Sequence, residues 1–173
     1  MRKNHNSLIS DRKRTTLRDT SLRSDTYKFD SKRDKDQADF RCNLSDSYEK
    51  GCIFCNVIRS QKFLVENDLA VAILDGHPVT KGHTLVIPKR HISDYFETTE
   101  SERKAINDLL CIWRRKLLVK DYDIEGFNIG INIGEAAGQT VFHAHVHLIP
   151  RRVGDTPKPM GGVRGVISNK MNY

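Results

Sequence analysis

Three histidines at alternate positions, His143, His145 and His147, constrain this chain more than any other feature. Residues 141–149 (VFHAHVHLI), which carry them, have the β-branched and aromatic composition of a strand and stop before Pro150. Successive side chains of a strand point to opposite faces, so the three imidazoles are predicted on one face and the apolar residues between them on the other. The chain is therefore expected to build a sheet with one buried face and one histidine-bearing face.

The spacing of these histidines limits what they can bind together. Neighbours two residues apart lie roughly 6.5 Å apart along a strand, and the outer pair roughly 13 Å apart. Two ligands of one zinc cannot be that distant, because each Zn–N bond is about 2.0–2.1 Å long. At least one of the three histidines must therefore have a task other than sharing one ion.

Nucleophilic catalysis is the chemistry that a histidine can perform unaided. Its ordinary pKa is about 6.5, so the ring is mostly neutral at pH 7 and needs no general base. One ring nitrogen must keep its proton on an acceptor so that the other presents a lone pair. Attack on phosphorus would then form a phosphohistidine that water can cleave in a second step.

The remaining patterns predict an α+β fold. Residues 52–60 suggest a short helix, and the capping box at Thr99 with the apolar stripe on residues 106–117 predicts a long one. Residues 69–74, 84–87 and 126–134 read as further strands, the last one half-buried with period two. Short turns between several of them favour an antiparallel sheet with helices on one side.

Composition divides the 173 residues into a folded part and two extensions. Residues 1–47 mix Lys, Arg, Asp and Ser and are predicted to form a disordered basic arm. Residues 48–152 form the domain, and residues 153–173 a Gly- and Pro-rich tail. The net charge of +7 favours anionic partners, and the arm leaves nucleic-acid binding open, although its acidic residues disfavour it.

Several classes of protein are excluded. The sequence has no apolar run of about 20 residues, no secretory h-region and no repeat of about 20–50 residues. Four cysteines are too few for a disulfide scaffold, and Cys52-x-x-Cys55 indicates metal or redox chemistry, or else two reduced core thiols. We expect a soluble, cytoplasmic protein without a membrane partner.

Three strings resemble the histidine triad (HIT) family: CIFCNVI, LDGHPVTKGHTLVIPKRH and GQTVFHAHVHLIPR. They occur in the family's order over roughly residues 51–152. The branch typified by galactose-1-phosphate uridylyltransferase is disfavoured, because it has Gln where this chain has His147. The resemblance implies a HIT-like fold with an antiparallel sheet of about five strands, one long helix and a short N-terminal helix.

The resemblance also implies roles for individual residues. His145 would be the nucleophile, His147 would contact the phosphate and protonate the leaving group, and Gln139 would donate to the phosphate. Asp75 would accept from the ribose hydroxyls, and Asn132 and Thr140 would contact the phosphate. His83 would support the active site, and four apolar residues would line the base pocket: Ile53, Phe54, Val57 and Leu74. Core packing is the competing interpretation of the four apolar residues.

A structural zinc is implied by similarity to some bacterial members. Its ligands would be Cys52, Cys55, His91 and His143, a closed Cys₂His₂ site. This assignment gives His143 the separate task that the spacing demands. Family members also form homodimers through the long helix and the neighbouring strand, so we expect a homodimer.

The implied activity is that of a nucleotidyl hydrolase or transferase acting on a nucleoside 5′-phosphate anhydride or amide. Diadenosine tetraphosphate is the leading substrate; a phosphoramidate and a phosphorolytic reaction are alternatives. Removal of adenylate from nucleic-acid 5′ ends and a purely nucleotide-binding regulator remain open. Arg151, Arg152 and residues 161–165 (GGVRG) either reach a further phosphate or belong to a solvated loop.

Overall fold

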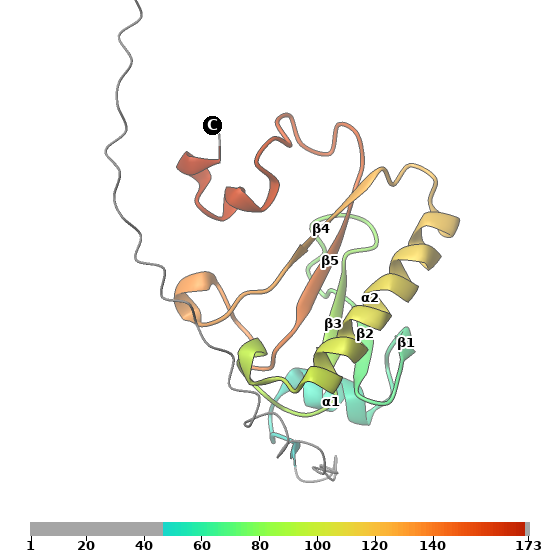
Figure 1. Cartoon of the computed structure of the whole chain (residues 1–173), viewed down its shortest axis with the longest axis vertical. Coiled ribbons are helices and arrows are strands. Elements are labelled where there is room, and N and C mark those ends of the chain that lie inside the picture. Colours follow the sequence, from blue (N-terminus) through green and yellow to red (C-terminus); the bar gives the residue numbers. More distant parts are fainter. Residues whose placement is uncertain (1–46, 172–173) are drawn as a thin grey trace, which may run out of the picture. The chain divides into compact units, whose positions relative to one another are not determined.

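The computed structural model describes residues 47–171. The predicted arm, apart from its last residue, lies outside the described residues, as do the last two residues of the tail. A single antiparallel sheet organises the described part (Figure 1). Its five strands are β1 (Val65–Glu66), β2 (Ala70–Leu74), β3 (Thr84–Pro88), β4 (Gly126–Gly130) and β5 (Val146–Arg151), in the order β1-β2-β3-β5-β4. The predicted α+β class is confirmed.

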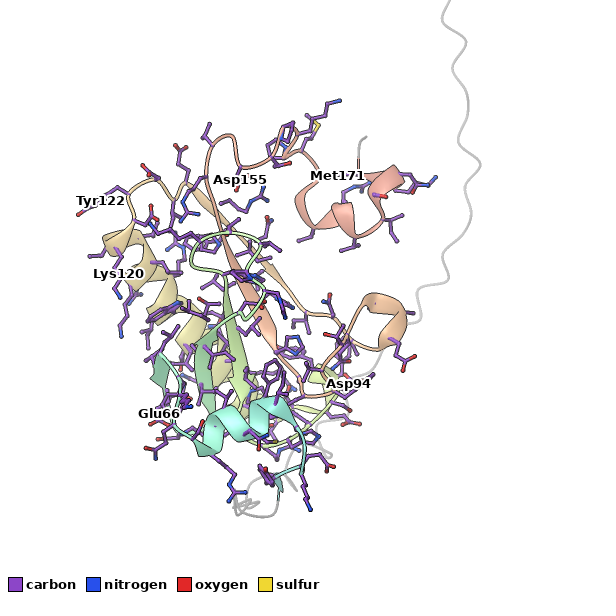
Figure 2. All side chains as sticks on the ribbon, turned by 180° about the vertical axis from the view of Figure 1, so that it is seen from behind. Glu66, Asp94, Lys120, Tyr122, Asp155 and Met171 are labelled. Carbon is purple, nitrogen blue, oxygen red and sulfur yellow. The ribbon has the colours of Figure 1, made fainter. Side chains whose placement is uncertain are left out.

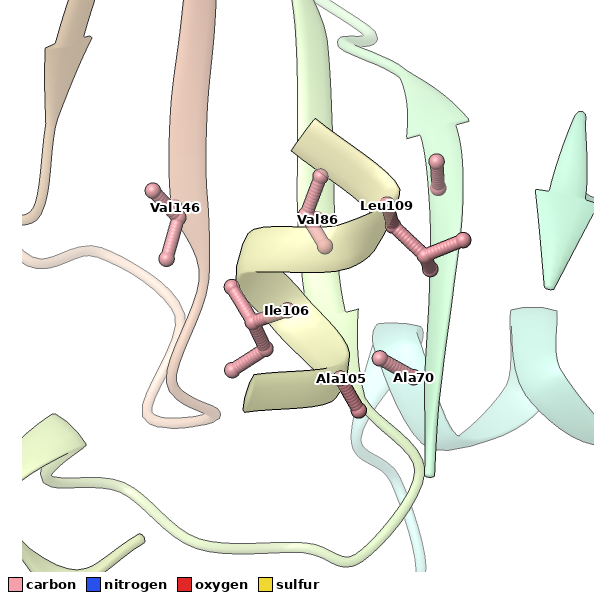
Figure 3. Packing of buried hydrophobic residues seen from close by; sticks show 7 residues of the cluster. Ala70, Val86, Ala105, Ile106, Leu109 and Val146 are labelled. Atoms are coloured by element: carbon pink, nitrogen blue, oxygen red, sulfur yellow. The ribbon is translucent and has the colours of Figure 1, made fainter. Parts of the chain in front are cut away.

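The long helix α2 (Glu100–Lys120) covers one face of this sheet. It begins where predicted: the Thr99 side chain accepts from the Glu102 backbone, and the Glu102 carboxylate accepts from the Thr99 backbone. Ile106 and Leu109 are buried against the sheet residues Val86 and Val146 (Figure 3). This apolar layer is the principal core and stabilises the domain by removing hydrocarbon from water.

The short helix α1 (Ile53–Arg59) packs against the opposite face, so the prediction that the helices share one side was wrong. Its Phe54 belongs to a cluster with the strand residues that alternate with those under α2: Val71, Ile73, Leu85 and Ile87. Because residues of both parities are apolar in β2 and β3, both faces of these strands are buried.

Two strands differ in extent from their predictions. β5 begins only at Val146, and it continues through Pro150, whose missing N–H is tolerated because β3 pairs only with residues 146–148. β4 ends at Gly130, which pairs with His147 near the start of β5. Beyond this pair β4 does not continue, Val146 of β5 pairs only with Val86 of β3, and Gly134 turns with a φ of 80° into a short 3₁₀ turn.

Short 3₁₀ turns complete the described chain: Tyr95–Glu97, Glu135–Ala137, Gly162–Val166 and Ser168–Lys170. The last two lie in the predicted tail. Gly161 there has a φ of 90°, and a Cβ at this position would collide with the Met171 carbonyl oxygen, so only glycine fits. Within residues 47–171, helices lack the length and apolarity needed to cross a membrane.

The start of α2 is tied to the loop after β3 by an ion pair. Arg90 donates two hydrogen bonds of 2.8 Å to the Glu102 carboxylate, which is almost fully buried. Burial by itself would raise the pKa of Glu102, but the bonds from Arg90 and from the Thr99 backbone outweigh it and hold the pKa below its usual range. The charged form is therefore favoured by folding.

Replacing Glu102 with a neutral residue tests how much its charge contributes to the stability of the fold. Glu102→Gln should lower the free energy of unfolding by about 1–3 kcal/mol, because the guanidinium loses its partner while the cap survives. Since the folded pKa is depressed, the contribution is present above the ordinary Glu pKa of about 4.3 and is lost as the pH falls through the folded value. Urea unfolding from neutral to acidic pH measures both effects.

The exposed Glu100 in the same helical turn provides the matched control. Glu100→Gln removes the same charge from the same end of α2 but breaks no buried pair. Equal destabilisation by the two variants would show that the helix terminus, and not the Arg90 pair, stabilises this region.

Candidate active site and metal centre

The central histidine of the triad has a defined tautomer. His143 and His145 lie just before β5, and only His147 lies within it, so the prediction of one regular strand through all three was wrong. The Nδ1 atom of His145 lies 2.7 Å from the carbonyl oxygen of His143. A carbonyl can only accept, so Nδ1 carries the proton and Nε2 carries the lone pair.

Packing holds this ring in place. His145 is 6% exposed, and the Phe54 ring of α1 meets it edge-on with centroids 5.1 Å apart. The His147 ring lies at the same centroid distance on another side. A ring that is fixed by one hydrogen bond and two aromatic contacts can present its other nitrogen in a constant direction.

The four residues implied as zinc ligands, Cys52, Cys55, His91 and His143, lie together. Their ligand atoms all lie within 4.8 Å of one another. The Sγ atoms of Cys52 and Cys55 are 3.5 and 3.6 Å from Nδ1 of His143, and Sγ of Cys55 is 3.4 Å from Nδ1 of His91. Tetrahedral zinc with bonds of about 2.3 Å to sulfur and 2.0–2.1 Å to nitrogen separates such atoms by about 3.6 Å, so the cluster fits a structural zinc.

The protonation of His143 agrees with this role. Its Nε2 lies 2.9 Å from the Pro88 carbonyl oxygen and must donate to it, which leaves a lone pair on Nδ1 facing the sulfurs. Burial lowers the pKa of His143 to about 4, and the neighbouring His91 and His145 add to this against the opposing bond to Pro88. Burial raises the pKa of the Cys55 thiol, and a bound cation would lower this pKa by stabilising the thiolate.

A second cluster joins Asp75, His83 and His147 on the other side of His145. Nε2 of His83 lies 3.0 Å from Nδ1 of His147, and Nδ1 of His83 lies 3.3 Å from the Asp75 carboxylate. Its three ligand atoms are also close enough to hold a cation, but the two rings already satisfy each other directly.

Electrostatics keep His147 neutral in the free protein. Burial lowers its pKa to about 4, with contributions from His145 and His83, while Asp75 acts in the opposite direction. Burial also lowers the pKa of His83 against the opposing effect of Asp75. The other nitrogen of His147, Nε2, is buried and has no hydrogen-bond partner within the described part of the chain. Because buried polar atoms normally have a hydrogen-bond partner, this nitrogen beside the nucleophile is a candidate contact for a bound ligand.

The three residues predicted to contact phosphate differ in how far they are exposed to solvent. Thr140 is exposed and Asn132 half-buried, so both can reach a ligand. Gln139 is buried, and its amide donates to the carbonyls of Ser93 and Val141 while its Oε1 accepts from the backbone of Gly134. Its side chain therefore braces the turn before the triad, and its predicted donation to phosphate would require breaking these bonds.

The predicted base pocket is open on one side. Ile53 and Leu74 are 55% and 56% exposed, whereas Phe54 is buried against His145. A surface hollow of about 390 Å³ adjoins this set, lined by Val57, Lys62, Phe63, Leu64, Ile73 and Leu74. Sequence reasoning missed Phe63 and Ile73 here, although the apolar run of β2 could have indicated the latter.

The arginines after the triad already have carboxylate partners. Arg151 forms two bonds of 2.7 and 2.8 Å with Asp155, which Figure 2 labels, and Arg152 bonds Asp121 at 2.8 Å. These pairs favour a structural role over the phosphate contact that the sequence left open. The bonds lower the pKa of both carboxyls to about 2, with Arg151 as the largest cause for Asp155 and Arg152 for Asp121.

Comparison with known proteins adds to this geometry. The family profile described as HIT domain matches residues 57–154. An uncharacterised HIT-like protein of Saccharolobus solfataricus is 41% identical over 57% of this chain and 73% of its own length. The adenylylsulfatase HINT3 of Arabidopsis thaliana is 37% identical over 64% of this chain, but the match spans only 57% of that relative.

Solved structures agree with the fold. A zinc-bound histidine triad family protein from Mycobacterium smegmatis has a TM-score of 0.57 and 37% identity, over 62% of this chain and 80% of that one. A histidine triad nucleotide-binding protein from Candida albicans has a TM-score of 0.55 and 30% identity, over 61% and 78%. The zinc-bound structure supports the assignment of Cys52, Cys55, His91 and His143 as a structural zinc site.

Metal analysis tests this site. Purified protein should contain one zinc per chain by mass spectrometry, and Cys55→Ser should lose most of it. Because the metal ties together segments far apart in sequence, removal by a chelator should lower the melting temperature by roughly 10 °C.

The exposed Cys111 on α2 is the control, and Cys111→Ser should keep its zinc. Pure protein that holds no zinc, with Cys52 and Cys55 both titrating freely with a thiol reagent, would rule the site out.

Proposed function

This chain belongs to the HIT domain family, and from that premise we propose that it is a nucleotidyl hydrolase or transferase. Its substrate is a nucleoside 5′-phosphate anhydride or amide, and its nucleophile is His145. The observation that carries the proposal is the 2.7 Å hydrogen bond from Nδ1 of His145 to the His143 carbonyl, because it leaves the lone pair on Nε2.

The reaction proceeds in two displacements. The Nε2 lone pair of His145 attacks the α-phosphorus, and the bond from phosphorus to the leaving group breaks. A nucleotidyl-histidine remains, whose developing positive charge is shared with the His143 carbonyl through the Nδ1 proton. Water, or another acceptor, then attacks phosphorus and returns the bonding pair to Nε2.

His147 supplies and recovers the proton. Its buried Nε2 has no hydrogen-bond partner among residues 47–171 and lies on the ring next to His145. An anionic phosphate beside this ring raises the pKa of His147 from its low value in the free protein, so the bound substrate recruits its own acid. Proton transfer to the leaving group typically accelerates such steps by about 10²–10⁴-fold.

The substrate contacts follow the predicted set with one change of emphasis. Thr140 and Asn132 meet the phosphate oxygens, while Gln139 acts chiefly by bracing their turn. Asp75 accepts from the ribose hydroxyls, and Ile53, Phe54, Val57 and Leu74 contact the base. The exposed apolar surface of Ile53 and Leu74 supports this role, since a flat base would cover it.

Three leaving groups are the main candidates. They correspond to three substrates, of which diadenosine tetraphosphate is proposed first and a phosphoramidate second. The name of the Arabidopsis relative, adenylylsulfatase, favours adding adenylyl sulfate to this set. All three place the same adenylate on His145 and differ only in the group that departs.

Zinc contributes structure when bound, by joining α1, the segment after β3 and the start of the triad. Cys52 caps α1 and Cys55 lies within it, His91 comes from the segment after β3 and His143 from the start of the triad. No bond of the substrate changes there.

The exposed apolar residues Ile112 and Val119 on α2 and Ile129 on β4 support the proposed homodimer through this helix and strand.

The nucleophile is tested by substitution. His145→Ala should lower turnover of diadenosine tetraphosphate, adenosine 5′-phosphoramidate and adenylyl sulfate by more than about 10³-fold, with AMP binding retained. Chromatography of the products, with and without added phosphate, also separates hydrolysis from phosphorolysis. Calorimetry measures the binding of AMP.

The exposed His77, which lies between Asp75 and His83 in the chain, supplies the control variant His77→Ala, with wild-type turnover expected. If His145→Ala kept full activity on any of the three substrates, the covalent mechanism would be wrong. Nucleotide binding by the wild-type protein without turnover of any of them would favour a regulator instead.

A further inference from the structure

The surface hollow beside the predicted base pocket has one polar side chain in its lining. The other lining residues are aliphatic or aromatic: Val57, Phe63, Leu64, Ile73 and Leu74. The polar one is Lys62, which is exposed, and its ammonium has no hydrogen bond or ion pair with another group of residues 47–171. Because a lysine ammonium donates hydrogen bonds and cannot accept them, the side chains around this hollow offer donors to a ligand and no acceptor.

The sheet places this hollow in one row with the last histidine of the triad. Ile73 pairs with Leu85, and Leu85 pairs with His147, so the three residues lie in line across β2, β3 and β5. Neighbouring strands are about 4.8 Å apart, so the backbones of Ile73 and His147 are separated by roughly 10 Å. The strand order continues from β2 to β1 (Figure 1), and the Leu64 N–H donates to the Ala72 carbonyl just before β1 begins. The hollow therefore extends away from the triad, towards the β1 edge of the sheet.

The end of α1 determines where Lys62 enters this hollow. Gln61 has a left-handed φ of 54°, and its N–H donates to the Ile58 carbonyl at 3.1 Å. The N–H of Lys62 donates to the Val57 carbonyl at 3.3 Å. This pair of bonds is a common way to end a helix, and it turns the chain back along the last helical turn. Val57 and Lys62 are thereby held next to each other, and both line the hollow.

A purine nucleotide bound as proposed would place its base over this hollow. The phosphorus lies at His145, the ribose lies at Asp75 directly after β2, and the base extends outwards over the apolar lining. Position 6 of a purine is remote from the ribose, so it is the part of the base that reaches Lys62. Guanine and hypoxanthine have a carbonyl oxygen there beside the acceptor N7, whereas adenine has an amino group, which is a donor. The ammonium of Lys62 can donate to the first kind of base edge and is opposed by the second.

We propose that Lys62 is a specificity-determining residue that makes this enzyme prefer 6-oxopurine nucleotides, those of guanine and hypoxanthine, over adenine nucleotides. This inference rests on the proposed function of His145 and ranks the bases of its substrates, so that the adenylates named above react with a lower kcat/KM. A contact at the base is far from the reacting phosphorus and is made equally before and during the reaction. The preference should therefore lie in KM and leave kcat unchanged.

Calorimetry with IMP and AMP tests this preference, because the two nucleotides share ribose and phosphate and differ only at positions 1 and 6 of the base. The wild-type protein should bind IMP about fivefold more tightly than AMP. Lys62→Met keeps the length of the side chain but removes the donors, and should make the two affinities equal. Lys62→Arg keeps donors and should retain the preference. The 5′-phosphoramidates of inosine and adenosine should show the same ratio in kcat/KM, with equal kcat.

The variant Lys50→Met, which removes an exposed positive charge just before α1, is the control and should keep the wild-type ratio. Equal binding of IMP and AMP by the wild-type protein, or an unchanged ratio in Lys62→Met, would overturn the role of Lys62. Failure of the proposed function looks different: IMP and AMP would bind with the expected ratio, but neither phosphoramidate would be turned over, or His145→Ala would retain turnover. Binding of neither nucleotide would overturn both proposals.

Discussion

A single hydrogen bond, from Nδ1 of His145 to the carbonyl oxygen of His143, governs the chemistry of this protein. This bond fixes the proton on Nδ1 and leaves the lone pair on Nε2. It also makes the orientation of the His145 ring depend on the position of the His143 backbone. His143 is itself fixed at both ring nitrogens, by the Pro88 carbonyl and by the cysteine sulfurs. The structural zinc site and the nucleophile are therefore connected through one short stretch of backbone.

The fold places two unlike environments on either side of this nucleophile. Towards α1 lie the thiol sulfurs and imidazole nitrogens of the metal cluster, which are the ligand types that zinc prefers. Next to the end of β2 lies the carboxylate of Asp75, whose charge opposes the effect of burial on the pKa of His147. The segments that flank β3 supply His83 to one cluster and His91 to the other, and the triad supplies His147 and His143 in the same way. Because α2 covers the other face of these strands, the site occupies the face that the long helix leaves uncovered.

Much of this could be predicted from periodicity and motif. The stripe on residues 106–117 predicted α2, and the zinc ligand set that the resemblance implied lies together in one cluster, separate from the cluster of His147. The backbone acceptors were beyond reach, because no side-chain pattern encodes the carbonyls of Pro88 or His143. Gln139 was assigned to phosphate because the motif contains the residue but not its hydrogen-bond partners. The start of β5 was missed because alternation also suits an extended segment that bonds a loop, as Ala144 bonds Ile92, and not a strand.

Nitrogen-15 spectroscopy of the histidine rings tests the central claim most directly. At about pH 8 the zinc-loaded protein should show His145 with a protonated Nδ1 and an unprotonated Nε2, because the His143 carbonyl can only accept. Long-range proton–nitrogen correlations, assigned by comparison with His145→Ala, distinguish the two tautomers. An Nε2-protonated ring, or a ring that exchanges freely between both forms, would contradict the account.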